Sequence, residues 1–125
     1  MKRNVKMASQ HFLALALFAT LAVTLAASLP NDVIAGSRIP GDRLIQREEV
    51  KKDANWVGMK VTITKTFEGD KYSKISQLRA LDQHSNGHGA TAKIIAGGVG
   101  FSYVTIKFES ERFRGIDFVV ELYGK

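Results

Sequence analysis

The stretch VTIKFE at Val104–Glu109 alternates apolar and polar residues without a miss. Successive side chains of a β-strand point to opposite faces, so this pattern predicts a strand with one buried and one exposed face. The same alternation runs through IDFVVELY at Ile116–Tyr123 and through VGMKVTITKTF at Val57–Phe67, where Lys65 alone is out of phase. These three segments are therefore predicted to be strands.

Shorter patterns predict three more strands, at Arg43–Val50, Lys74–Leu81 and Ala90–Ile95. The second of these, extended back to Tyr72, also fits a short helix, because its apolar residues recur at helical spacing. Proline is absent beyond Asp42, as expected for paired strands. The sequence therefore predicts a mostly β domain, a single compact antiparallel β-sandwich or small barrel of about six strands, with a β-prism-like arrangement as the alternative. The predicted core consists of Val61, Ile63, Ile94, Val104, Ile106, Phe108, Ile116, Phe118, Val120 and Leu122.

The N-terminal segment has the three parts of a secretory signal. Met1–Lys6 is basic, Phe12–Leu29 has no charge over 18 residues, and the end of that run is built of small residues. We predict a helical signal peptide over residues 1–28, cleaved after Ala26, Ala27 or Ser28. The alternative is an uncleaved membrane anchor, since 18 uncharged residues are just long enough to span a bilayer. Under both interpretations the rest of the chain is exported.

Residues 29–41 contain both prolines and predict an extended leader that ends in a turn at Pro40-Gly41-Asp42. The β domain then occupies residues 42–125. The whole chain carries 18 Lys and Arg against 12 Asp and Glu, but removal of the signal peptide takes away three cations and leaves a net charge of +3. No run of like charge suggests a nucleic-acid-binding arm. The chain also has no cysteine, which excludes disulfide scaffolds, thiol nucleophiles and Cys-ligated zinc.

Asp82, His84 and His88 form the densest group of metal-ligating residues, because two imidazoles four residues apart can share a zinc or copper ion with a carboxylate. The intervening Asn86-Gly87 favours a turn over a helix and so separates the two imidazoles. We therefore predict no metal site and keep these three residues as the candidates for one.

The sequence contains no set of residues typical of an enzyme active site. Gly97-Gly98-Val99-Gly100 lacks the lysine of a phosphate-binding loop and favours a tight connection between strands. The carboxylates lack the pairing that glycoside hydrolysis needs, and the serines lack a nucleophile elbow. We predict a protein without catalytic activity or cofactor. Lys107, Arg112, Arg114 and Lys125 form a candidate basic edge near the C-terminus. We predict that it is a solvated face, with contact to an acidic partner or a membrane surface as the alternative.

Four motifs resemble one known family. They are GSRIPGDR at Gly36–Arg43, ISQLRALD at Ile75–Asp82, GGVG at Gly97–Gly100 and RGIDFVVELYG at Arg114–Gly124. Together they resemble the insect multiprotein bridging factor 2 family, whose members also occur as salivary secreted peptides, and they span nearly all of the chain after the signal peptide. The resemblance marks family-motif positions without assigning them a role: Pro40, Gly41, Asp42, Arg43, Arg79, Asp82, Gly97, Gly98, Gly100, Gly115 and Tyr123.

The resemblance implies two functions. Most relatives look like secreted proteins of saliva, haemolymph or cuticle, whereas the family name comes from a transcriptional co-activator that bridges two transcription proteins. The signal peptide favours the first function. We therefore predict a secreted extracellular binding protein, with the co-activator as the alternative. Its expected partner is a protein or small ligand outside the cell, with no direct contact to nucleic acid and with membrane contact only through the transient signal peptide.

Overall fold

The computed structural model describes residues 31–84 and 87–125, so the predicted signal peptide lies outside the described residues. Strands make up the regular structure of this part of the chain. Their bounds are β1 Val33–Gly36, β2 Arg43–Lys52, β3 Thr62–Glu68, β4 Ile75–Asp82, β5 Thr91–Gly97, β6 Tyr103–Glu109 and β7 Ile116–Gly124. No helix within these residues is long and apolar enough to cross a membrane.

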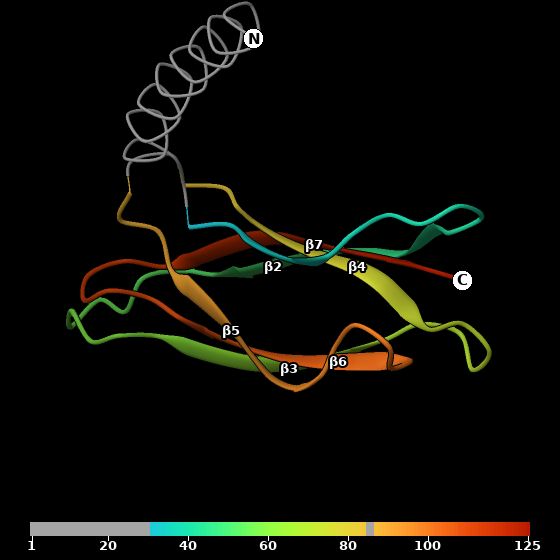
Figure 1. Ribbon diagram of the computed structural model, residues 1–125. Helices are drawn as coiled ribbons and strands as arrows, with labels where there is room; N and C mark the ends of the chain where they lie inside the picture. The colour runs from blue at the N-terminus through green and yellow to red at the C-terminus, as the bar shows by residue number, and fades with distance from the viewer. Residues whose placement is uncertain (1–30, 85–86) are drawn as a thin grey trace, which may run out of the picture.

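The strands form two antiparallel sheets, one of four strands in the order β1-β4-β7-β2 and one of three in the order β3-β6-β5. Figure 1 shows the two sheets stacked face to face, which confirms the predicted sandwich. The structure has one strand more than the six predicted. This additional strand is β1, which lies inside the predicted leader at residues 29–41. It pairs with β4 in the register Val33↔Ala80 to Gly36↔Gln77.

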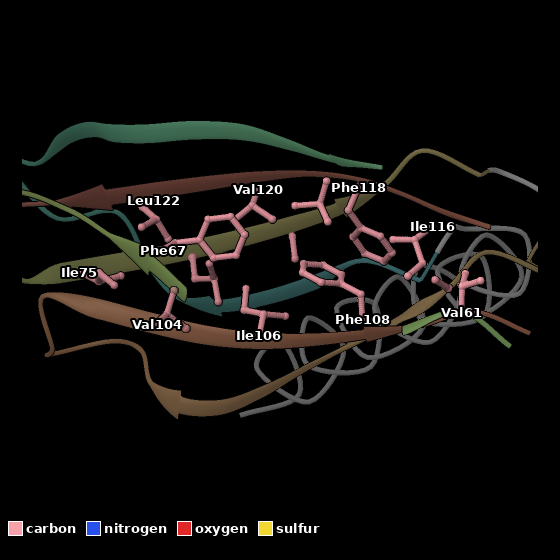
Figure 2. Packing of buried hydrophobic residues seen from close by; sticks show 14 residues of the cluster. Val61, Phe67, Ile75, Val104, Ile106, Phe108, Ile116, Phe118, Val120 and Leu122 are labelled. Atoms are coloured by element: carbon pink, nitrogen blue, oxygen red, sulfur yellow. The ribbon is translucent and has the colours of Figure 1, made fainter. Parts of the chain in front are cut away.

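The core lies between the two sheets, where the apolar faces of the strands meet (Figure 2). The rings of Phe108 on β6 and Phe118 on β7 have centroids 5.2 Å apart and contact each other across the layer. Eight of the ten predicted core residues are buried, while Ile63 and Ile94 are partly buried against them. The core also contains Val50, Phe67, Ile75, Leu78, Ala80 and Ala90.

The structure differs from the sequence-based prediction at the start of β3. The alternation at Val57–Phe67 predicted one continuous strand, but β3 begins at Thr62. Val57 and Met59 are 50% and 59% exposed and lie in a loop instead of on the core face. The cause is a turn closed by a hydrogen bond from Gly58 N to Asn55 O (2.9 Å), in which Gly58 takes a φ of +80°. The segment Ile75–Asp82 is a strand, so the helical alternative for it was wrong.

Candidate functional site

The turns of the sandwich gather at two opposite ends (Figure 1). The connections β1–β2, β3–β4 and β5–β6 lie at one end together with the C-terminus. The connections β2–β3, β4–β5 and β6–β7 lie at the other end, beside Asn31 at the start of the described chain, whose backbone N donates to Asp82 Oδ2 (3.0 Å). We call these the C-terminal end and the N-terminal end.

Most family-motif positions lie at the C-terminal end and hold its turns. Asp42 N donates to Ile39 O (3.1 Å), and Gly41 has a φ of +84°, which confirms the predicted turn at Pro40-Gly41-Asp42. The Asp42 carboxylate accepts hydrogen bonds from Ile39 N, Ser76 Oγ and Arg38 Nε, each at 2.8 Å. Desolvation raises the pKa of Asp42, but these hydrogen bonds outweigh it and leave the pKa below its ordinary value.

A second carboxylate orders the neighbouring β3–β4 connection. Asp70 accepts hydrogen bonds from Ser73 Oγ (3.0 Å), Ser73 N (2.6 Å) and Tyr72 N (3.0 Å), and it pairs with Arg43 Nη2 at 2.5 Å. The bonds from Ser73 contribute most, and together these contacts lower the pKa of Asp70 to about 2. The motif residue Arg43 therefore fastens β2 to this turn.

The remaining motif positions also take part in internal contacts. Gly97, Gly98 and Gly100 all have positive φ, and the Gly100 N–H donates to Ile75 O (2.9 Å). The Arg38 guanidinium lies 4.0 Å from the centre of the Tyr123 ring. Arg79 lies 3.9 Å from Glu121, and a Cβ on Gly115 would lie 2.5 Å from Lys52 O. The geometry shown here ties the motif positions to turns and to strand pairing.

The candidate metal ligands are only partly brought together. Asp82 is buried, and its carboxylate accepts from Asn31 N and His84 N at 3.0 Å each. His84 Nδ1 lies 3.7 Å from Asp82 Oδ1, whereas His88 Nδ1 lies 3.2 Å from Glu111 Oε2. Among residues 31–84 and 87–125, no group of three or more His, Cys, Asp or Glu side chains is placed to hold a metal ion.

Three open hollows on the described surface have volumes of about 180, 200 and 150 Å³. Each is smaller than the roughly 300–1,000 Å³ of a typical small-molecule site. None of these three hollows therefore suits a drug-sized ligand, and the features that project from the surface become the stronger candidates.

The most prominent of these features is an exposed cluster at the N-terminal end, which we call the apolar tip. It consists of Trp56, Val57, Met59 and Phe113, which are 93%, 50%, 59% and 68% exposed. Trp56 and Val57 occupy the centre of the turn Asn55–Gly58, and Val57 N donates to Asn55 Oδ1 (2.8 Å). Asparagine at the first position and glycine at the last are the residues that favour such a turn. The turn therefore presents the indole outward on an ordered backbone.

Phe113 joins the apolar tip from the β6–β7 connection. Arg114 N donates to Glu111 O (3.2 Å), and Phe113 in this turn has a φ of +64°, a conformation that bulky residues rarely adopt. Its ring covers Gly58, because a Cβ on Gly58 would lie only 2.1 Å from Phe113 Cε1. Arg112 Nε also donates to Gly58 O (3.2 Å), so the two loops are fastened together.

Cations surround the apolar tip, and we call Lys51, Lys52, Lys60, Arg112 and Arg114 the basic rim. All five are exposed, and residues 51–60 and 109–115 contain three acids, Asp53, Glu109 and Glu111. Of the rim cations, Lys60 has its Nζ 3.5 Å from Glu109 Oε1. Lys51 and Lys52 also line the hollow of about 180 Å³ beside the turn. The candidate basic edge of Lys107, Arg112, Arg114 and Lys125 is not assembled, since Lys125 lies at the C-terminal end, where its Nζ donates to Pro40 O (3.2 Å). Arg112 and Arg114 do lie together, in the basic rim.

The apolar tip was not predicted from the sequence, because period-two patterning placed Val57 and Met59 in a strand. The signal that could have found it is local: Asn55-Trp56-Val57-Gly58 has the residues of a β-turn, with two large apolar side chains at its centre. The contribution of Phe113 could not be found in this way, because it depends on contact with Gly58 in a distant loop.

The fold and this end of it define a small, cysteine-free β-sandwich with an apolar tip carried on two fastened loops. The model of the family described as "Transcription activator MBF2" matches residues 35–124 of this sequence, which cover all seven strands except the first two residues of β1. The chain belongs to this family, as the motifs predicted. It is also 42% identical over 95 residues to a protein of Bombus ignitus named "Probable salivary secreted peptide", and the match covers 76% of this chain and 70% of that protein. No solved structure matches.

Proposed function

We propose that this chain is an exported, non-enzymatic binding protein that acts outside the cell and binds through its apolar tip. Trp56 carries the proposal: an indole 93% exposed at the centre of a hydrogen-bonded turn contributes almost nothing to the core of the sandwich. Aromatic anchors held on ordered backbone are typical of binding surfaces, since little conformational entropy is lost when they are covered.

Two further observations support the proposal. The residue that closes the tip, Phe113, adopts a costly backbone conformation and still remains 68% exposed. Local strain of this kind is concentrated at functional sites. The name of the similar Bombus ignitus protein, "Probable salivary secreted peptide", agrees with export of this chain, and so does the signal-peptide pattern of residues 1–28.

Export is tested by expressing the full chain with a C-terminal tag in insect cells. We expect the tagged protein in the medium, with a new N-terminus after Ala26, Ala27 or Ser28 when the secreted form is sequenced. Recovery in the nucleus or cytosol with Met1 still attached would overturn the proposal.

The second candidate function is a transcriptional co-activator, which is favoured by the family description "Transcription activator MBF2". It requires the chain to reach the nucleus, which an active signal peptide prevents. The localisation experiment therefore separates the two candidates directly.

A further inference from the structure

We infer that the apolar tip inserts into the surface of membranes that contain anionic phospholipids. This inference rests on the proposed extracellular function and names the partner of the same site. It departs from the expectation that the chain meets membranes only through its signal peptide.

The shape of the apolar tip favours a soft partner. Its side chains stand on the crests of two turns, Asn55–Gly58 and Glu111–Arg114. A crest of this kind fits the headgroup region of a bilayer without a complementary cavity in the partner. Tryptophan prefers this region, because its ring is apolar and its N–H remains in contact with water.

Backbone polar groups of the apolar tip already have hydrogen-bond partners within the protein. An unsatisfied N–H or C=O is costly in an apolar medium. In this tip, Gly58 N donates to Asn55 O, Val57 N to Asn55 Oδ1, and Gly58 O accepts from Arg112 Nε. These internal hydrogen bonds reduce the cost of placing the turn at the membrane interface.

The charges around the tip select the lipid. The basic rim places five exposed cations beside the apolar crest, and Lys60 among them is paired with Glu109. Lys and Arg near an anionic leaflet each strengthen binding about fivefold, and their aliphatic stems allow the charged groups to stay at headgroup level. An apolar crest with cations at its base is complementary to an anionic lipid surface. A zwitterionic lipid surface carries no net negative charge and attracts these cations less.

The chain supplies its own probe, because Trp56 is the single tryptophan of the sequence. The experiment uses the full chain as it is processed and recovered from expressing cells, mixed with vesicles of phosphatidylcholine alone or of phosphatidylcholine and phosphatidylserine. We expect the Trp56 emission to shift to shorter wavelength only with the anionic vesicles, and the protein to co-sediment with them. Added salt is expected to weaken the binding.

Matched variants at the two ends test the orientation. Trp56→Ser is expected to lower the partition coefficient about tenfold or more, whereas Tyr72→Ser, at a side chain 92% exposed at the opposite end, leaves it within about twofold. Lys51→Gln with Lys52→Gln is expected to lower it about tenfold or more, and Lys71→Gln with Lys74→Gln has little effect. The two ends of the sandwich are separated by the length of β2, whose ten residues span about 30 Å. This distance is several times the electrostatic screening length in physiological salt, so charges at one end act little on lipid bound at the other.

Equal binding by wild type and Trp56→Ser, or an unchanged Trp56 emission with anionic vesicles, would overturn the inference. An emission that instead changes with protein concentration, together with a dimer in sedimentation velocity, would overturn it in favour of a second copy of the chain. If the exported chain does not bind vesicles but binds an extracellular protein through Trp56, the inference is overturned and the proposed function stands. Retention of the chain inside the cell would overturn the proposed function. The vesicle measurement is independent of that outcome, because it can be made on protein recovered from any compartment.

Discussion

Glu48 on β2 and Lys65 on β3 form an ion pair between the inner faces of the two sheets, from Lys65 Nζ to Glu48 Oε1. Glu48 lies opposite Val120 and Lys65 opposite Ile106 in their sheets, so both side chains point toward the core side. Gln46 Nε2 also donates to Glu48 Oε2 (3.1 Å). β2 and β3 are edge strands of their sheets, and inward-pointing charges at such edges discourage pairing with another chain.

Replacing one partner of this pair is expected to destabilise the fold. Lys65→Met leaves a half-buried carboxylate without its cation and is expected to lower the free energy of unfolding by about 1 kcal/mol. The measurement is urea denaturation followed by circular dichroism.

The control is the double variant Glu48→Leu with Lys65→Leu. It is expected to recover the stability lost in the single variant, because no unpaired charge remains. It is also expected to form larger species in sedimentation velocity, because both edges lose their inward charge. A double variant that is as dispersed as wild type at equal concentration would contradict the role in edge protection.

Lys65 also shows how far the sequence could predict the fold. It was the single residue out of phase in the alternation of Val57–Phe67, and the structure shows that the phase is correct, with Lys65 on the core side. The alternation is therefore a reliable guide to the faces of β3, β6 and β7. The sequence could not show why a lysine faces inward, because its partner Glu48 comes from the opposite sheet.

Six of the seven strands and the two-layer arrangement could be predicted, because each of these six has a local signal. β1 could not, since its four residues pair with β4 far along the chain. The apolar tip was missed for a related reason. Periodicity does not distinguish an apolar residue that starts a strand from one that protrudes in a turn, and Val57 and Met59 were of the second kind.

Removal of a large core side chain from β7 is expected to destabilise the fold strongly. Phe118 is fully buried and contacts Phe108 across the layer. Phe118→Ala is expected to lower the free energy of unfolding by about 3–5 kcal/mol, through lost burial and the cavity that remains. The control is Val119→Ala on the outer face of the same strand, where we expect about 1 kcal/mol or less. Equal losses for the two variants would show that the assignment of faces is wrong.

The stability of the C-terminal end is expected to depend on Asp70 in acid. The pKa of Asp70 is about 2 in the fold, against an ordinary value of 3.8, chiefly because of hydrogen bonds from Ser73. A carboxyl with a lowered pKa stabilises the folded state fully above its ordinary value, and this contribution is lost as the pH falls from about 3.8 toward about 2.

Asp70→Asn removes this titration. The Tm of the variant is therefore expected to lie below that of wild type at pH 6, and the gap is expected to close as the pH approaches 2. Thermal unfolding at a series of pH values measures both. Asp53→Asn, at an exposed carboxylate of the β2–β3 connection, serves as the control. A gap that is constant with pH would show that Asp70 acts without titrating.

The last prediction concerns the contact that fastens the apolar tip. Gly58 and Gly100 both lie in the left-handed region, with φ of +80° and +89°, so alanine at either position is strained by about 1 kcal/mol. A Cβ on Gly100 meets nothing within 4 Å, whereas a Cβ on Gly58 would lie 2.1 Å from Phe113 Cε1. Gly58→Ala must therefore displace the Phe113 ring, and Gly100→Ala need not move its surroundings. We expect Gly58→Ala to lose about 1–3 kcal/mol more than Gly100→Ala in urea denaturation. We also expect the emission and quenching of Trp56 to change only in Gly58→Ala, because the turn that holds the indole shifts with the ring. Identical stability and identical Trp56 quenching in the two variants would show that Phe113 does not hold the β2–β3 loop in place.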